Sequence, residues 1–526
     1  MDVIELSLFS NRLAAVCDEM GAILQRAAFS PNIRDRLDFS CAVFDAQGSL
    51  CAQAAHIPVH LGSMAYAMQS IVSRFDWQAD DMVIVNDPYL GGTHLPDVTF
   101  ISPVIIDGNM LAFVANRAHH ADIGADSPGS MPISSSLEEE GLIIPPIYIC
   151  RQGIVQKDMM DMLLNATRQP QTMQGDVAAQ MSANRTGCQR VSAMIKELQN
   201  TSGKQSFTSA RFTSALAELN DYGERLAQPV YQNIPNGEYC FTDYMDDDGQ
   251  GTTQIPITAC IRVKENLIQV DFAGTSKQVP GNINCPLSVA AAAVYYVFRC
   301  LLPEYTPACA GTFRAISLLA PESCLVNASR PAAVAAGNVE TSTRIVDVII
   351  GALLQAIPEQ LAAASHGSMN NVAMGFAGDG CNGAGQPAWD YYETIGGGMG
   401  ASPKSDGLSG VQTHMTNTLN TPVEVLETNY PLRIKQYALR KHSGGAGKHH
   451  GGNGIIREYE FTHAATVTLL TERRQRAPWS VEGGEEAEVG LNSLNSETLP
   501  AKVSVQVSKG DRLKIETPGG GGWGKS

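Results

Sequence analysis

The sequence predicts an α+β protein of several packed units, with a mixed α/β region near the N-terminus and a β-rich region at the C-terminus. Three observations predict this. The chain has 526 residues, more than one hydrophobic core ordinarily serves. Helical apolar periodicity marks its opening, and alternating segments between glycine-rich turns mark its second half. We place the regions at 1–200, 201–337 and 338–526.

Composition and charge exclude several classes of partner. The formal net charge of −16 argues against nucleic acid or an anionic membrane. The twelve cysteines lack a CxxC pair, which is typical of free thiols in a reducing cytosol and not of a disulfide framework. The start of the chain lacks a basic signal-peptide segment, and the longest apolar run, Leu287 to Phe298, is too short for a bilayer. We expect a cytoplasmic protein with no membrane partner.

The first element is a predicted helix that ends before Pro31, with apolar residues every three or four positions on one face. Phe39 to Phe44 then has the composition of a strand, followed by a turn. Asp38 stands at the start of that strand, and Asp35 lies just before it. Either carboxylate can serve a polar site or pair with the neighbouring Arg34 and Arg36.

His60 precedes a helix predicted from Ser63 to Phe75. A histidine at such a position can cap the helix or point into a pocket, and the residues alone favour capping. Asn86 to Gly92 forms a tight loop after a buried strand. This loop aims the residues that follow, and Asn86 and Asp87 are candidates for hydrogen bonds that support them.

A β-hairpin comes next. Val98 to Ile106 and Leu111 to Val114 are apolar strands, and Asp107 to Asn109 is the turn between them. One polar cluster, Thr93 to Asp97, precedes the hairpin, and another, His119 to Asp122, follows it. The two clusters therefore meet at the open end of the hairpin.

The length of the turn decides which residues face each other. A three-residue loop places Ile106 opposite Met110 and, counting back, Asp97 opposite His119. A two-residue loop shifts the register by one and places Asp97 opposite Ala118.

Imidazole nitrogens and carboxylate oxygens that converge on one point suit Zn²⁺, Mn²⁺ or Fe²⁺. We therefore predict one divalent metal at the hairpin end, bound by His94, Asp97 and His119, which makes the N-terminal α/β region metal-bearing. His120 is the alternative ligand if the register shifts by one. The competing interpretation is a polar hairpin end that faces solvent.

The middle of the chain predicts helices and an antiparallel sheet. Residues 158–198 are helical with a break at 168–170, residues 237–272 alternate as strands do, and Leu287 to Leu302 form a helix. Thr341 or Ser342 caps a further helix that runs through Ile357.

Glycine-rich loops dominate the last third. The loops at 365–371 and 396–400 are typical of the walls of a binding cleft. Gly444 to Lys448 is similar to a phosphate loop, but His442 stands where the first glycine is required and His449 where Ser or Thr is required. We predict no nucleotide loop. The end of the chain, Pro518 to Lys525, is expected to be mobile or docked on a partner.

The runs NDPYLGGTHLPD, RAHHADIG and LEEEGLIIPP resemble the hydantoinase B family, and the resemblance extends from RLDFSCAVFDAQG to the glycine-rich end. That family includes B subunits of hydantoinases, the C-terminal half of 5-oxoprolinases and a large subunit of acetone and acetophenone carboxylases. The resemblance implies that Asp38 is a fourth metal ligand beside His94, Asp97 and His119, and that His60 points into the pocket.

The resemblance also implies a division of labour. A separate hydantoinase A-type ATPase subunit uses ATP to phosphorylate the oxygen of a small cyclic amide, and this chain, as the B component, hydrolyses the activated amide at its metal. The catalytic candidates are Asp97, His120, Asp122 and His60, and one glutamate of 138–140 is a candidate to reach the site. Two alternatives stay open. One is a subunit of an ATP-dependent ketone carboxylase, and the other is a non-catalytic stabilising subunit with a structural metal.

Overall fold

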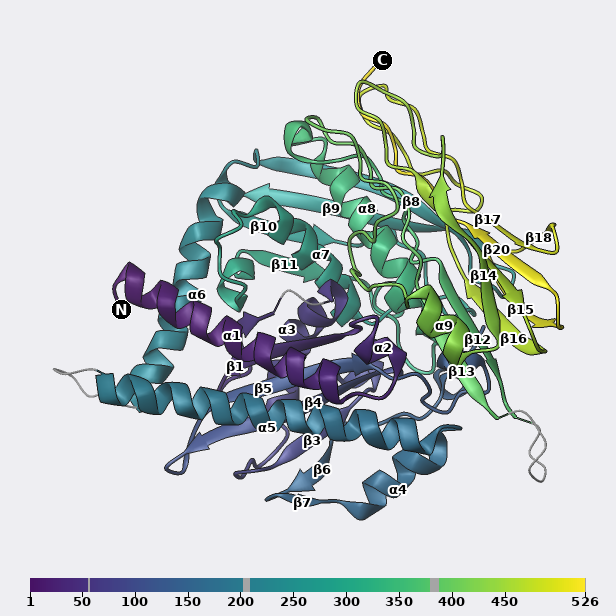
Figure 1. Cartoon of the computed structure of the whole chain (residues 1–526). Coiled ribbons are helices and arrows are strands. Elements are labelled where there is room, and N and C mark those ends of the chain that lie inside the picture. The colour runs from purple at the N-terminus through teal and green to yellow at the C-terminus, as the bar shows by residue number, and fades with distance from the viewer. Residues whose placement is uncertain (55–56, 202–208, 379–386, 526) are drawn as a thin grey trace.

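The computed structural model describes residues 1–54, 57–201, 209–378 and 387–525 (Figure 1). The described strands form four sheets, of seven, four, four and five strands, and helices pack against them, which agrees with the predicted α+β class. The largest hydrophobic cluster runs from Ile57 to Leu470 and so includes residues from all three predicted regions. None of the described helices combines the length and the apolar character needed to span a bilayer.

The N-terminal sheet has the strand order β2-β1-β5-β4-β3-β6-β7. Helices α1 (Val3–Ala27) and α5 (Pro170–Thr201) lie side by side across one face (Figure 1), and α3 (Pro58–Val72) covers the other. Neighbouring strand residues alternate between these faces: Val43 packs towards α1 and Phe44 towards α3. The strands are β1 (Phe39–Asp45), β2 (Leu50–Gln53), β3 (Met82–Val85), β4 (Asp97–Ile106), β5 (Asn109–His119), β6 (Ile147–Arg151) and β7 (Ile154–Val155).

The predicted opening helix is confirmed, and a capping box starts it. The Asp2 side chain accepts a hydrogen bond from the Glu5 backbone at 2.8 Å, and the Glu5 carboxylate accepts one from the Asp2 backbone at 3.1 Å. Pro31 begins the short helix α2 (Pro31–Arg34). The predicted break at residues 168–170 is confirmed, since it separates α4 (Lys157–Ala166) from α5.

The hairpin pairs Asp97 with His119, the register predicted for a three-residue loop. The loop nevertheless has only two residues, because Ile106 pairs with Asn109. Both loop residues have positive φ, as tight hairpin turns require. A bulge after Val104 shifts the register by one and compensates for the shorter loop. The predicted pairing is therefore confirmed, and the predicted loop length is wrong.

The middle region is a sheet of order β11-β10-β9-β8 with helices against it. Its elements are α6 (Ser209–Gln232), β8 (Gly237–Asp247), β9 (Thr253–Lys264), β10 (Leu267–Asp271), α7 (Leu287–Leu301), β11 (Ile316–Leu319) and α8 (Ser342–Leu353). Because α8 packs on β8 and β9, this region extends in the structure beyond the predicted boundary at residue 337, to Leu353. A π-helical turn, η5 (Gly337–Thr341), leads into α8, so neither Thr341 nor Ser342 caps it by a side-chain bond. The helix ends at Leu353, before the predicted Ile357.

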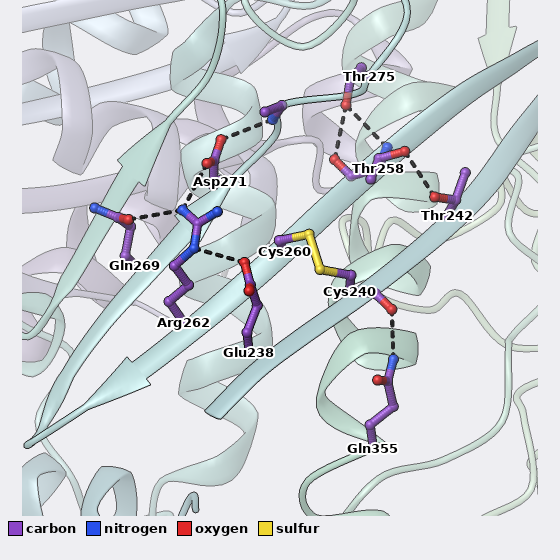
Figure 2. Close-up of a disulfide and its surroundings, with 11 residues drawn as sticks. Glu238, Cys240, Thr242, Thr258, Cys260, Arg262, Gln269, Asp271, Thr275 and Gln355 are labelled. Atoms are coloured by element: carbon purple, nitrogen blue, oxygen red, sulfur yellow. Dashed lines mark hydrogen bonds and ion pairs between the residues drawn. A yellow bond between two sulfur atoms is a disulfide. The ribbon is translucent and has the colours of Figure 1, made fainter. Parts of the chain in front are cut away.

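One cross-strand disulfide corrects the expectation that all thiols are free (Figure 2). Cys240 of β8 and Cys260 of β9 lie directly opposite each other, with Cα atoms 4.1 Å apart. Beside them Arg262 bridges Glu238 at 2.8 Å and Asp271 at 2.9 Å (Figure 2). The pairing depends on the strand register, which sequence spacing does not show.

The C-terminal region contains two sheets, of order β13-β12-β16-β19 and β14-β15-β20-β17-β18, that share one hydrophobic cluster. Their strands are β12 (Asn371–Phe376), β13 (Trp389–Glu393), β14 (Leu432–Arg440), β15 (Gly454–Phe461), β16 (Ala465–Leu470), β17 (Leu491–Leu494), β18 (Glu497–Leu499), β19 (Lys502–Val507) and β20 (Arg512–Glu516). The remaining helices are η1 (Pro88–Leu90), η2 (Pro128–Ser130), η3 (Leu137–Glu140), η4 (Ala310–Phe313), η6 (Pro358–Gln360) and α9 (Val423–Asn429).

The glycine-rich segment 518–523 is buried against the chain's own loops, which corrects the expectation of a mobile or partner-bound end. Gly520 accepts a hydrogen bond from the Gly445 backbone at 2.9 Å and donates one to Gly452 at 3.0 Å. Gly521 donates to Ala364 at 2.8 Å. The loop similar to a phosphate loop therefore holds this segment.

We predict that Gly451→Ala destabilises the protein by more than ~3 kcal/mol. An added Cβ would lie 1.7 Å from the Gly520 carbonyl oxygen, where neither backbone can move without breaking the buried contacts. The control is Gly510→Ala, whose Cβ meets nothing within 4 Å and whose φ of +93° costs ~1–2 kcal/mol. Urea unfolding of both variants tests this, and equal losses would contradict it.

A second prediction concerns Glu393 on β13, which is buried and pairs with Arg457 at 2.9 Å. Burial opposes ionisation of Glu393, but Arg457 and Tyr459 outweigh it and lower its pKa. Because the folded pKa lies below the unfolded value near 4.5, the stabilisation is complete above that pH and is lost as pH falls through the folded pKa.

We therefore expect Glu393→Gln to cost ~3–5 kcal/mol at neutral pH, since Arg457 loses its buried partner. The difference from wild type should shrink as the pH drops below 4.5. Chemical unfolding across that pH range measures it, and a difference that grows in acid would contradict the expectation.

Candidate metal centre

Three neighbouring strands meet at one edge of the N-terminal sheet: β1 and β4 begin there, and β5 ends there. In the sheet order, β5 lies between β1 and β4. Asp97 pairs with His119, and Phe39 pairs with Ala118, so Asp38 stands next to His119 on its other side. The backbone confirms this, since His119 donates to the Asp38 carbonyl at 3.0 Å. All three side chains belong to the face that α3 covers.

The buried carboxylate of Asp97 lies at the middle of the site. Its Oδ1 is 3.1 Å from His94 Nε2 and 3.2 Å from His119 Nδ1, and its Oδ2 is 3.1 Å from His60 Nε2. Thr93 Oγ1 also donates to Oδ2, at 2.7 Å. One ligand atom from each of His94, Asp97 and His119 lies within 4.8 Å of the other two.

The loop before β4 fixes His94. Asn86 donates to the Leu95 carbonyl at 2.8 Å and accepts from the Ile144 backbone at 2.6 Å. A Cβ at Gly92 would lie 2.0 Å from the Asn86 carbonyl oxygen, so only glycine permits this loop. His94 Nδ1 lies 3.1 Å from the Ala335 carbonyl, and donating to it leaves Nε2 free to face Asp97. Asn86 thus supports the loop backbone beside His94, and Asp87 accepts from the Tyr89 backbone, but the contact to the His94 ring comes from Ala335.

His60 points into the site and not along its helix. Helix α3 begins at Pro58, five residues before the predicted start, because proline is favoured in a first turn. His60 therefore lies inside that turn. Its Nδ1 is 3.4 Å from Ser40 Oγ of β1, and its Nε2 faces Asp97. The pocket placement that the resemblance implies is confirmed, and the capping interpretation is wrong.

The donor set fits a small cation. Nε2 of His94 and Nε2 of His119 are both buried; the first lies 3.1 Å from Asp97 Oδ1, and the second has no hydrogen-bond partner among the described residues. They border a cavity of about 20 Å³, enough for one water or ion. Burial lowers the pKa of His119, which favours the neutral imidazole that a metal requires. Burial opposes ionisation of Asp97, yet His60 and His94 hold its pKa well below its usual range.

Asp38 lines the same cavity but stands further out. Its carboxylate is 4.0 Å from His60 Nε2 and 3.8 Å from Arg36. Asp35, the competing candidate, pairs with Arg34 at 2.9 Å and does not line the cavity. The geometry therefore favours Asp38 over Asp35 as a member of the site.

The structure does not bring His120 and Asp122 to this site. His120 follows His119 and so points to the opposite face, where Nε2 lies 2.8 Å from Gln180 of α5. The Asp122 carboxylate accepts from the backbones of Gly124 at 2.8 Å and Arg168 at 2.7 Å. Both predicted catalytic placements are corrected, because each side chain is used to hold local structure.

Other residues of the site come from far along the chain. Asn338 of η5 donates to Asp97 Oδ2 at 3.2 Å. Tyr392 of β13 stacks on His119 with ring centroids 4.5 Å apart, and Arg36 lies 4.7 Å above the Tyr392 ring. No motif marks these residues, since their position depends on how the three regions pack.

The glutamate run contributes support from behind the site. Glu140 is buried and accepts from Ser134 Oγ at 2.7 Å and from the Ala335 backbone at 2.9 Å. Burial raises the pKa of Glu140 to about 7. It holds the backbone that contacts His94 and does not line the cavity.

Known proteins match this chain over its full length. A protein of a Pseudomonas species, described as the putative B subunit of a D-/L-hydantoinase, is 31% identical, with 100% of this chain and 90% of that protein covered. 5-Oxoprolinase 1 of Arabidopsis thaliana is 36% identical, and the chain covers 42% of it. The chain thus spans less than half of that oxoprolinase.

Solved structures agree as well. The ATP-dependent caprolactamase of Pseudomonas jessenii superposes with a TM-score of 0.89 at 26% identity, covering 100% of this chain and 91% of that one. An acetone carboxylase, at 16% identity and a TM-score of 0.86 with 100% and 76% covered, shares the fold. The family model for hydantoinase B/oxoprolinase matches residues 2–526, and the chain belongs to that family.

Proposed function

We propose that this chain is the B component of an ATP-dependent hydrolase of small cyclic amides, and that it uses one divalent metal, Zn²⁺, Mn²⁺ or Fe²⁺. His94, Asp97 and His119 would hold the metal, with Asp38 as the fourth ligand. The observation that carries the proposal is the buried Asp97 carboxylate, which three imidazoles share; one of them, His119, has a buried Nε2 with no hydrogen-bond partner among the described residues.

A divalent metal held by these residues would supply Lewis-acid chemistry, for polarising an acyl oxygen and for easing deprotonation of a water. His60 is the imidazole beside Asp97 that lies outside the three-residue ligand group. We assign it to proton transfer, because Ser40 and Asp97 hold its two nitrogens in place. Tyr392 keeps the His119 ring in position by stacking on it.

The proposal assigns ATP to another subunit. A planar amide is a poor electrophile, and phosphorylation turns its oxygen into a leaving group. The segment from Gly444 to Lys448 supports this assignment, since its backbone is engaged by the segment at 518–524: Lys448 donates to the Gly524 carbonyl at 3.0 Å. A hydantoinase A-type ATPase is the partner that would supply the activated amide.

A cleft of about 430 Å³ is lined by residues of two chain segments that also border the metal cavity. Asp390 and Ala121 line the cleft, while Tyr392 and His119, two residues away on the same segments, line the metal cavity. We propose that substrate approaches along these segments.

Two alternatives depend on the same geometry. A ketone carboxylase subunit would use the metal to hold an enolate and would require a small ketone and CO₂ as substrates. A stabilising subunit would keep a structural metal, and then substitution of the ligands would alter stability without altering turnover in a folded complex.

The first test measures metal in the purified chain. We expect about one equivalent of divalent metal in wild type and in Asp122→Asn, and less than a tenth of that in Asp97→Asn. The two substitutions are matched, since both remove a charge from a buried aspartate, but only Asp97 lies in the ligand group. Elemental analysis decides, and equal metal in both variants contradicts the proposal.

The second test separates ATP use from ring opening. The chain alone should neither hydrolyse ATP nor open 5-oxoproline, hydantoin or caprolactam. With an A-type partner, Asp97→Asn should lower product formation by more than ~100-fold while ATP consumption continues slowly, since phosphorylation occurs on the partner.

ATP turnover and product should be measured in the same mixture, with Asp122→Asn as the control. Ring opening by Asp97→Asn at the wild-type rate would transfer support to the stabilising role. Incorporation of labelled CO₂ into a ketone, with no cyclic amide opened, would support the carboxylase.

A further inference from the structure

A second cavity, of about 230 Å³, lies between α3 and α7, away from the metal centre. The two helices touch where Gly62 packs on Ala292, and the cavity opens beside that contact. The metal cavity is lined by Val59 and His60, whereas this one is lined by Pro58 and Leu61 of the same helical turn. The two cavities therefore lie on different sides of the first turn of α3.

The walls of this cavity are apolar and aromatic. Leu61 and Ala65 come from α3, Tyr295 from α7, and Phe313 from η4. Tyr295 and Phe313 stack with ring centroids 4.5 Å apart, so this wall is rigid. Such a surface favours a flat or aliphatic ligand body, and the volume lies below the ~300–1,000 Å³ of drug-sized sites.

One cation interrupts the apolar lining. Arg299 of α7 lines the cavity, and its Nη2 donates to the Thr306 carbonyl at 2.6 Å. Its Nη1 is buried and has no hydrogen-bond partner in the part of the chain that the structure describes. Among the described residues, the titratable neighbours of this guanidinium are Cys309, Tyr231 and Cys300, and none is a carboxylate. The neighbouring Gln53 also lines the cavity, and its Oε1 is buried without a partner among the described residues.

Buried polar atoms in proteins are nearly always hydrogen-bonded, and a buried unpaired charge is costly. The Arg299 Nη1 donor indicates a missing acceptor at this cavity, whereas Gln53 Oε1 is itself an acceptor and would not hold a carboxylate. A guanidinium recognises a carboxylate through strong, directional hydrogen bonds. A dianion such as phosphate fits less well, because the cavity offers a single cation and an apolar wall.

We propose that this cavity binds a small monocarboxylate with an apolar body, such as a short fatty acid or a single-ring aryl acid, with its carboxylate on Arg299 and its body between Leu61, Tyr295 and Phe313. The site is separate from the metal centre and does not depend on the proposed hydrolase activity.

Isothermal titration of the full-length chain tests the site, with hexanoate and phenylacetate as probes and hexanamide and phenylacetamide as neutral counterparts. We expect saturable binding of at least one acid, with each matching amide at least ~10-fold weaker, because the amide lacks the charge that pairs with Arg299. The titration needs neither ATP nor a partner subunit, so its result is independent of the activity test.

Two variants locate the site by different means. Arg299→Gln removes the cation, and Ala65→Leu fills the cavity while keeping Arg299. Each should weaken binding at least ~10-fold. Arg262→Gln, at a surface arginine on β9, is the matched control and should bind as wild type does. If Arg299→Gln fails to fold, Ala65→Leu decides.

Carboxylates also bind metals, so the titration is carried out on metal-stripped protein and repeated with Asp97→Asn, and the acid should still bind both. Three results overturn the proposal. These are no saturable binding of either acid, binding that Ala65→Leu leaves unchanged, and binding that disappears with the metal.

Discussion

The pairing of Asp97 with His119 across one hairpin is the constraint on which this centre depends. Asp97 contacts His60, His94 and His119 at once, and every contact requires its side chain on the α3 face of the sheet. A slip of one residue would turn its side chain to the other face, where α5 packs. The bulge after Val104 is therefore as important to the site as the side chains it aligns.

The centre is also the place where the three regions meet. Asn338 of the π-helical turn reaches Asp97, and Tyr392 of β13 stacks on His119. Glu340, in the same turn as Asn338, is buried and accepts a hydrogen bond from the Met369 backbone at 3.0 Å. Arg473 ties the middle region to the C-terminal one through Asp347 at 2.6 Å. A substitution that disturbs the packing of any of these regions would therefore displace residues of the centre.

Local structural features could be predicted from the sequence. The opening helix, the break before α5 and the pairing of Asp97 with His119 all depend on short-range periodicity or on counting along one hairpin. The same rule of alternation separates His119 from His120, since adjacent residues of a strand point to opposite faces. That signal was present in the sequence and excludes His120 once Asp97 and His119 are paired.

Contacts between segments that are distant in the sequence could not be predicted from local patterns. The Cys240–Cys260 bond, the Tyr392 stack and the use of Asp122 as a backbone acceptor depend on which segments meet, and no local pattern encodes that. His60 shows the intermediate case. Its place in the pocket follows from the family resemblance, whereas its helix begins five residues before the predicted start because Pro58 occupies the first turn.

The buried glycine-rich segment has a consequence for the order in which the chain matures. Backbone atoms of 518–523 complete the contacts of loops near Ala364, Gly445 and Gly452. Those loops are synthesised long before the segment that satisfies them. While residues 518–523 are still inside the ribosome, the earlier loops have open backbone groups and an unfilled groove. The C-terminal layer can therefore close only after these residues emerge, and a stalled or truncated chain would expose that groove to chaperones and proteases.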